Sequence, residues 1–334
     1  MKPAEFYDLL LDYAASPEPV REVVIGLVWS YCRAESIGLA MSPGGQTRTL
    51  PWAGTLRGKT LAELAGWLRD FEPYRATVGM AAANAAINRL QPKPDGVLLQ
   101  PGAAGSNLVV FEHFLPQLRD HQVVVVGRYP GLDEFAATHG LRLTVLERQP
   151  GPNDMPDTAC EYLLPEAEWV FLTAGSITNK TFPRLAELSR NAITVLMGPT
   201  TPWLPELYHF GIDYLAGMEI ADAEQLRAVV CEGGGVRLFD GGVRYRVAAL
   251  TRPAAQDWSR SLIAGTVREK ETLLQAMADW YNRGHTARYP DYGQLDGVNR
   301  RLSRLDSCFK RLWDENSDAL ETKAYSATHR KRER

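Results

Sequence analysis

Short apolar runs alternate with helical patterns between residues 119 and 250, and few folds accommodate such an order. The apolar runs have the length and β-branched content of strands buried on both faces; they are "QVVVVG", "LRLTVLE", "EWVFLTAG", "AITVLMGP" and "IDYLAG". Helical patterns such as "GLDEFAATHG" and "FPRLAELSRN" lie between most of them. Strand and helix in alternation predict a parallel sheet with right-handed crossovers. We therefore predict an α/β protein with a Rossmann-like domain over residues 119–250.

The first 118 residues carry a different pattern, in which strands precede helices. The stretch "VREVVIGLVWSYCRAESIGLAMS" predicts two strands joined near residues 34–36. Thr60 and Glu63 have the spacing of a capping box and open a helix over "TLAELAGWLRDF". Pro73 begins a second helix, whose many Ala and Gly residues allow close backbone packing. Residues 1–118 are thus predicted to form a small α+β domain.

The last segment, residues 251–334, is predicted to be a helical extension. Apolar residues spaced for one face of a helix run from Trp258 to Tyr281, and Gly284 marks its end. A second stripe, from Leu295 to Leu312, alternates three and four residues apart as in a coiled coil. The pattern predicts an αα-hairpin that packs on the two domains or on another subunit.

The composition is that of a soluble globular protein, with 45% hydrophobic and 23% charged residues. No apolar run approaches the ~20 residues of a membrane helix, and acidic residues interrupt the apolar stretch at the N-terminus, unlike in a secretory signal. The four cysteines are scattered, as expected of free thiols in a reducing compartment. We expect a cytoplasmic protein with no membrane contact. The basic end, "HRKRER", is interpreted as a solvated terminus and not as a nucleic-acid-binding patch.

Small and polar residues follow each predicted parallel strand, at the sheet edge where open α/β folds bind ligands. Each loop also has a structural explanation: a tight turn at residues 127–131, an ion pair of Glu147 with Arg148, a helix N-cap within residues 173–179, or a rigid loop at residues 198–202. The hydroxyls and amides after "WVFLT" exceed what one cap uses, which favours a ligand there. The candidate ligand-binding residues are Gly127, Arg128, Tyr129, Glu147, Thr173, Gly175, Ser176, Thr178, Asn179, Gly198, Pro199, Thr200 and Thr201.

Several common catalytic and ligand-binding motifs are missing from the sequence. It has no GxGxxG turn, Walker A loop, HExxH, GxSxG or EF-hand loop. Pro130 and the bulky Arg128 and Tyr129 would crowd a pyrophosphate. The guanidinium of Arg128 could instead grip a carboxylate or phosphate as a fork. The six histidines lie mainly on predicted helices or surface turns. The sequence therefore identifies neither a catalytic residue nor a set of metal ligands.

Taken in order, these segments resemble a bacterial and archaeal family described as "putative heavy-metal chelation" proteins. The resemblance covers about residues 20 to 230 and is carried by "IGLAMSP", "RTLPWAGTLRGKTLAELAGWL", "TVGMAAANAAIN", "VVVVGRYPGL", "LTVLERQPGPNDMPD", "EAEWVFLTAGSITNKTFPRLAEL", "VLMGPTTPWLPELYHFGIDYLAG" and "EIADAEQL". It implies an enolase-N-terminal-like domain followed by a Rossmann-like domain, with a ligand cleft between them. The helical segment after residue 255 is not part of the family pattern.

The family's recurring positions carry over residue by residue. They match Gly127, Glu147, Thr173, Gly175, Asn179, Gly198, Pro199 and Pro202. In the first domain they match Asn84 and Asn88, which share a helix face and either point into the cleft or pack against backbone carbonyls. Ala174 stands where the family usually has a second Gly or Thr, which leaves the contacts of that loop open.

Three functions are compatible with these residues. The favoured one is a binding protein that holds a small anionic molecule, or a transition metal with its organic chelator, for metal handling or metallocofactor assembly. The second is a transferase or lyase acting on an anionic metal-binding metabolite, with Glu147 as general base; an ion pair with Arg148 works against that role. The third is docking of a partner, or of a second copy in a homo-oligomer, through the C-terminal helices.

Overall fold

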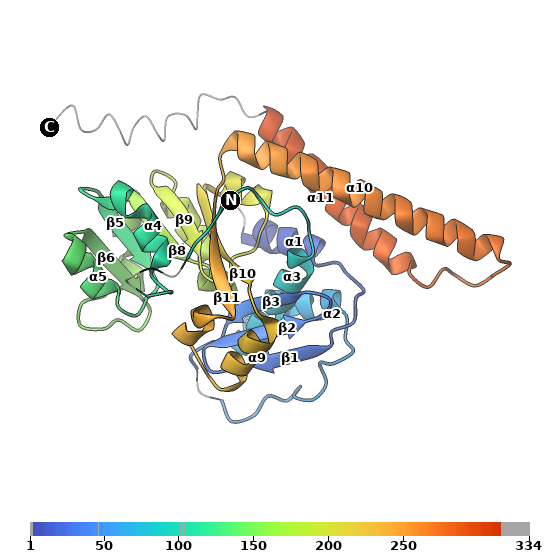
Figure 1. Cartoon of the computed structure of the whole chain (residues 1–334), viewed down its shortest axis with the longest axis horizontal. Helices are drawn as coiled ribbons and strands as arrows, with labels where there is room; N and C mark the ends of the chain where they lie inside the picture. Colours follow the sequence, from blue (N-terminus) through green and yellow to red (C-terminus); the bar gives the residue numbers. More distant parts are fainter. Residues whose placement is uncertain (1–2, 46, 101, 103–104, 315–334) are drawn as a thin grey trace.

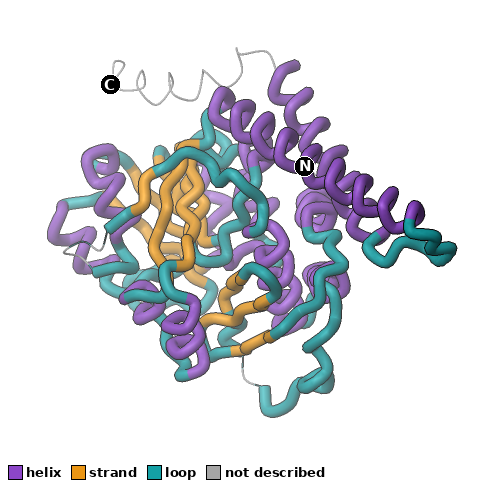
Figure 2. Tube along the Cα trace, turned by 45° about the vertical axis from the view of Figure 1, so that its right-hand side comes forward, coloured by secondary structure: helices purple, strands orange, loops and turns teal. Residues whose placement is uncertain are grey.

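The computed structural model describes residues 3–45, 47–100, 102 and 105–314, so the basic "HRKRER" sequence lies outside the described residues. The chain forms two sheets with helices around them, and a long helical hairpin leads away from this body (Figures 1 and 2). This arrangement confirms the predicted α/β fold. None of the helices in the described ranges combines the length and apolar character needed to cross a membrane.

The larger sheet contains eight described strands in the order β4-β11-β10-β9-β8-β5-β6-β7. The strands from β10 to β7 pair in parallel, as predicted, whereas β10–β11 and β11–β4 are antiparallel and form one edge. Alternate valines of β5 face the two hydrophobic clusters on opposite sides of the sheet. The strands are β4 (Val97–Leu98), β5 (Gln122–Val126), β6 (Arg142–Glu147), β7 (Met155–Pro156), β8 (Trp169–Thr173), β9 (Ile193–Met197), β10 (Tyr214–Ile220) and β11 (Val243–Ala249).

The strand order reverses between β5 and β8. From β5 the chain moves outward to β6 and β7, then returns to the other side of β5 to form β8. One face of the sheet is covered by α4 (Val109–Leu118), α5 (Leu132–His139), α9 (Ala223–Cys231) and η5 (Val236–Asp240). The opposite face is covered by α6 (Cys160–Leu163), η3 (Leu164–Glu166), α8 (Phe182–Leu188) and η4 (Pro205–Phe210). The loops after β5 and β8 lead to opposite faces, which is the position where such sheets bind ligands.

The N-terminal sheet has three strands, whereas two were predicted. The first predicted strand is folded into a hairpin of β1 (Glu22–Ile25) and β2 (Trp29–Arg33), in which the Gly26 N–H donates to Trp29 O at 3.0 Å. Leu27 lies 79% exposed at its tip. Gly26 suits this turn because a Cβ there would lie 2.5 Å from Val230 O. The connection from β2 to β3 (Ile37–Met41) lies at residues 34–36, as predicted.

The helix α3 (Pro73–Asn88) packs directly on this sheet. A Cβ at Gly38 of β3 would lie 2.2 Å from Ala81 O, so the alanine-rich face allows the predicted close approach of the two backbones. The predicted capping box is confirmed: the Glu63 N–H donates to Thr60 Oγ1 at 3.1 Å and the Thr60 N–H to Glu63 Oε2 at 2.7 Å. The other N-terminal helices are α1 (Pro3–Tyr13), α2 (Leu61–Ala65) and η1 (Gly66–Arg69).

The predicted C-terminal hairpin consists of α10 (Arg252–Asn282) and α11 (Tyr292–Asp314), which lie side by side and project past the body (Figures 1 and 2). Four residues of the predicted stripe on α11 are buried, namely Leu295, Val298, Leu305 and Leu312. The helix α11 also packs on the N-terminal segment, where a Cβ at Gly297 would lie 2.0 Å from Ala15 O. Arg304 Nε donates to Asp12 Oδ2 at 2.5 Å. The hairpin therefore joins the two ends of the described chain.

Candidate binding site at the ends of the parallel strands

Gly127 and Thr173 meet where the strand order reverses. Gly127 follows β5 with a φ of +96°, a conformation that glycine adopts at low cost, and its N–H donates to Leu146 O on β6 at 2.9 Å. A Cβ at Gly127 would lie 3.0 Å from Thr173 Cγ2, on the last residue of β8. The loops after β5 and β8 therefore touch, and the contact favours glycine at the first of them.

Arg128 is held by the loop that follows β6. Its Nε donates to Asp154 Oδ2 at 2.9 Å and its Nη2 pairs with the same carboxylate, whereas its Nη1 has a longer ion pair of 3.8 Å with Asp133. The hydrogen bond to Asp154 raises the pKa of Arg128. Burial disfavours the charge of Asp154, but the hydrogen bonds from Arg128 and the Gly151 N–H outweigh it and keep the pKa of Asp154 below its usual value.

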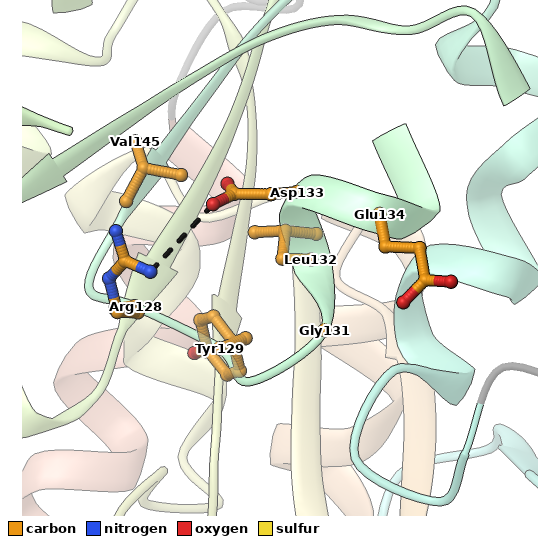
Figure 3. Close-up of a pocket in the computed structure, with 7 residues that line it drawn as sticks. All are labelled: Arg128, Tyr129, Gly131, Leu132, Asp133, Glu134 and Val145. Carbon is orange, nitrogen blue, oxygen red and sulfur yellow. Dashed lines mark ion pairs between the residues drawn. The ribbon is translucent and has the colours of Figure 1, made fainter. Parts of the chain in front are cut away.

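A cavity of about 180 Å³ opens beside this arginine (Figure 3). Asp133 and Glu134 lie in the first turn of α5, where carboxylates interact favourably with the helix dipole. In Figure 3 the guanidinium of Arg128 faces the carboxylate of Asp133, whereas the carboxylate of Glu134 lies on the other side of the start of α5. The lining residues of the cavity are Arg128, Tyr129, Gly131, Leu132, Asp133, Glu134 and Val145.

Tyr129 lines the cavity and is held in place by contacts with Phe111 and Thr173. Its ring meets the ring of Phe111 nearly edge-on, with 5.4 Å between the centroids, and its hydroxyl forms a hydrogen bond with Thr173. Burial raises the pKa of Tyr129 well above its ordinary value. The phenol is therefore neutral at physiological pH and ties the β5 loop to the end of β8.

The carboxylate of Glu147, at the end of β6, accepts backbone N–H groups. Its Oε2 accepts the Arg128 N–H at 2.9 Å and its Oε1 accepts the Arg148 N–H at 2.7 Å. The Arg148 side chain pairs instead with Asp157, at 3.3 Å and at the start of η2 (Asp157–Ala159). Glu147 therefore orients the loop that carries Arg128.

The polar residues after β8 bond mainly to their own turn. Ser176 Oγ donates to Thr173 O at 2.6 Å, and Thr178 Oγ1 donates to Gly175 O at 2.8 Å, within the short helix α7 (Gly175–Thr178). The Asn179 side chain accepts the Thr181 N–H at 3.1 Å. These bonds show how the turn is built, because each hydroxyl satisfies a backbone carbonyl.

The loop after β9, residues 198–202, is buried against β3 and α3. Thr200 Oγ1 accepts the Met41 N–H at 3.0 Å, and the Thr200 carbonyl accepts Asn84 Nδ2 at 2.9 Å. Asn84 Nδ2 also donates to Leu39 O at 2.8 Å, and Asn88 Nδ2 donates to Ile37 O at 2.9 Å. The sequence left two placements open for these asparagines. The structure shows the second, in which both side chains donate to backbone carbonyls.

The structure thus divides the candidate residues into three groups. Arg128 and Tyr129 line the cavity, and Gly127, Glu147 and Thr173 contact the loop that carries them. The turn after β8 contains Gly175, Ser176, Thr178 and Asn179, which bond mainly within it. Residues 198–202 and the two asparagines lie where the loop after β9 meets β3 and α3. The sequence did not point to Asp133, Glu134 or Asp154, although Asp154 is the last residue of the turn signal "GPND", residues 151–154. Among the described residues, no three His, Cys, Asp or Glu side chains are grouped to hold a metal ion.

Two family models match the chain, and both are described as "Putative heavy-metal chelation". The DUF4213 model matches residues 7–87, which include the N-terminal sheet and α3. The DUF364 model matches residues 109–249, which include β5 to β11 and the cavity. No curated protein matches the chain.

Two solved structures of the DUF364 family resemble the fold. A protein with unknown function from Desulfitobacterium hafniense is 29% identical, with a TM-score of 0.60, and the match covers 73% of this chain and 97% of that one. A protein with unknown function from Pyrococcus horikoshii is 18% identical, with a TM-score of 0.60, and the match covers 75% of this chain and 100% of that one. The second similarity concerns the fold alone.

Proposed function

The chain belongs to the family described as "Putative heavy-metal chelation", and from this membership we propose that it binds a compact complex of a metal ion with an organic chelator. The site is the cavity beside Arg128. Binding there would serve metal handling or the assembly of a metallocofactor.

The charges that line the cavity carry this proposal. Arg128 presents a guanidinium, and Asp133 presents a carboxylate on the first turn of α5. A metal–chelator complex has groups for both, because its carboxylate arms are anionic while the ion and any amino groups are cationic. A guanidinium is well suited to the arms because its donors match the geometry of a carboxylate.

The contacts of Arg128 indicate which of its atoms would meet the ligand. Nε and Nη2 are both bonded to Asp154, which fixes the plane of the guanidinium. Nη1 is 3.8 Å from Asp133, a distance beyond a hydrogen bond. The Nη1 group can therefore donate to a chelator carboxylate while Asp154 keeps the side chain in place.

The size of the cavity favours a compact ligand. Its volume of about 180 Å³ is below the roughly 300–1,000 Å³ of pockets that enclose drug-sized molecules. A di- or tricarboxylate that wraps one metal ion is of suitable size, and larger cofactors would extend into solvent.

Calorimetry on the full chain tests the proposal, with Ni²⁺, citrate and the Ni²⁺–citrate complex as three separate probes. We expect the complex to bind more tightly than either component, and Arg128→Ala to weaken it about 10- to 100-fold, the range for a charge-assisted hydrogen bond. Arg184→Ala is the matched control, because Arg184 is also an exposed arginine paired with carboxylates, but on α8.

Native mass spectrometry of freshly purified protein provides an independent readout, since a bound complex would add its mass to the chain. The proposal is wrong if the native spectra contain no added mass and none of the three probes binds. It is also wrong if Arg128→Ala and Arg184→Ala leave the affinity for the complex equally unchanged.

A further inference from the structure

The C-terminal hairpin brings a thiol against an imidazole of the Rossmann-like domain. Cys308 lies on α11 and is 4% exposed, and its Sγ is 3.8 Å from Nε2 of His209 in η4. Ser259 Oγ of α10 is also 3.8 Å from the thiol. His209 is only partly buried. Three segments that are remote in sequence therefore converge on this sulfur.

We propose that Cys308 and His209 bind a soft monovalent metal ion, namely copper(I). A thiolate and an imidazole are ligands that such an ion prefers. Metal–sulfur and metal–nitrogen bonds of about 2.3 and 2.0 Å, as found for zinc, together span about 4.3 Å. Since the observed Sγ–Nε2 distance of 3.8 Å is shorter, one ion can contact both atoms with a bent S–metal–N angle, and an increase of about 0.5 Å in that distance gives the linear geometry of two-coordinate copper(I).

Binding at this pair has a defined proton balance. The Cys308 thiol releases its proton to solvent when the sulfur coordinates the ion, and the neutral imidazole donates the lone pair of Nε2. The described residues contain no group of three His, Cys, Asp or Glu side chains arranged around an ion. A two-coordinate site matches this pair, and copper(I) accepts two ligands.

A buried carboxylate supports a cation at this place. Glu206 lies three residues before His209 in η4, is 6% exposed, and accepts a hydrogen bond from the Tyr13 hydroxyl at 2.5 Å on Oε1. Its other oxygen, Oε2, has no hydrogen-bond partner among the described residues. Burial disfavours the charge of Glu206, and the charge of Arg304 offsets this only in part, so a bound ion would further reduce the cost of the buried carboxylate.

The test is an anaerobic titration of the full chain with copper(I) against bicinchoninic acid as a competing chelator. We expect one site on the wild-type protein, and a loss of affinity greater than about 100-fold in Cys308→Ser and in His209→Gln, because even outer-shell changes cost about 10- to 100-fold. Cys231→Ser is the control, since Cys231 is an exposed thiol on α9 and outside this pair.

X-ray absorption on the loaded wild-type protein keeps the test independent of how well the variants fold. One sulfur and one nitrogen donor are expected, and a spectrum with sulfur donors alone would overturn the proposal. Unchanged affinity in Cys308→Ser and His209→Gln, or a loss in Cys231→Ser only, would do the same. The family matches end at residue 249, so this site, which needs Cys308, can fail while the cavity beside Arg128 still binds its ligand.

Discussion

The side-chain amide of Asn84 donates to the backbone carbonyl of Thr200 at 2.9 Å and so links α3 to the loop after β9. The same nitrogen donates to Leu39 O at 2.8 Å, and Asn84 is 2% exposed. One side chain therefore satisfies two buried carbonyls from two parts of the chain. The contact therefore contributes to holding the loop after β9 against β3 and α3.

Asn84→Ala is expected to lower the free energy of unfolding by about 2–4 kcal/mol. It removes two hydrogen bonds and leaves both carbonyls buried without these partners, at about 1–3 kcal/mol for such a group. Urea denaturation measures the change. Asn153→Ala is the control, because Asn153 is exposed and its side-chain bond to Asp133 is 3.5 Å long. Equal effects of the two substitutions would contradict the proposed role of Asn84.

Gly127→Ala is expected to be more destabilising than Gly140→Ala. Both glycines have positive φ values, +96° and +63°, so each alanine incurs backbone strain of about 1 kcal/mol or more. A Cβ at Gly140 meets no atom within 4 Å, whereas one at Gly127 would lie 3.0 Å from Thr173 Cγ2. The difference between the two measured free energies therefore reports the contact with β8 together with the larger strain of an alanine at +96°, which lies outside the left-handed helical region. Similar losses would show that the contact yields without cost.

Gly297→Ala is expected to loosen the hairpin from the N-terminal segment. The new Cβ would lie 2.0 Å from Ala15 O, so α11 must shift. Gly293→Ala on the same helix is the control, because its Cβ would meet only Pro17 at 3.8 Å, an ordinary contact. We expect the control to be neutral or stabilising by up to about 1 kcal/mol. Limited proteolysis near residue 250, together with the melting temperature, would distinguish the two variants.

Stability is expected to fall as the pH rises from about 4.5 to 7 because of Glu206. Burial raises its pKa from 4.5 to about 7, although the hydrogen bond from Tyr13 and the charge of Arg304 act in the opposite direction. The folded protein holds this proton more tightly than the unfolded chain, so the contribution is complete below pH 4.5 and is lost between about pH 4.5 and 7. At about 1.4 kcal/mol per pH unit the loss is on the order of 3 kcal/mol.

Glu206→Gln should remove this part of the pH dependence, since glutamine does not titrate. Urea unfolding of both proteins at pH 5 and pH 8 gives the comparison. The stability of the wild-type protein should decline more than that of the variant over this range. Parallel declines would show that Glu206 titrates as it does in the unfolded chain.

Much of the fold could be predicted because strands that are buried on both faces of a sheet consist almost entirely of apolar residues. The run "QVVVV" of β5 is an example. The capping box at Thr60 could be predicted from its spacing. The strand β11 was not predicted, although Arg244 and Arg246 alternate with buried Val243 and Tyr245 in the period of a half-buried strand. The hairpin at Gly26 was missed because β-branched residues continue on both sides of it.

The candidate site was less predictable, because a polar side chain does not specify its partner. Ser176 and Asn84 both suggested a ligand, yet Ser176 bonds to its own turn and Asn84 to a carbonyl 116 residues away. The pairing of Asp154 with Arg128 could not be predicted from the sequence. The two residues are 26 positions apart and meet only through the path of the loop that follows β6. The polar residues after the predicted strands indicated the edge of the sheet that carries the site. Only the tertiary contacts show which side chains at that edge line the cavity.

The contacts of α1 have a consequence for how the protein is made. Asp12 pairs with Arg304, which is 292 positions later in the chain. At a synthesis rate of about 5–20 residues per second, the ribosome needs roughly 15–60 s to deliver that partner. During this interval Phe6 can already meet Phe182 and Phe210, whereas the side of α1 that faces α11 remains without its partner until translation is nearly complete.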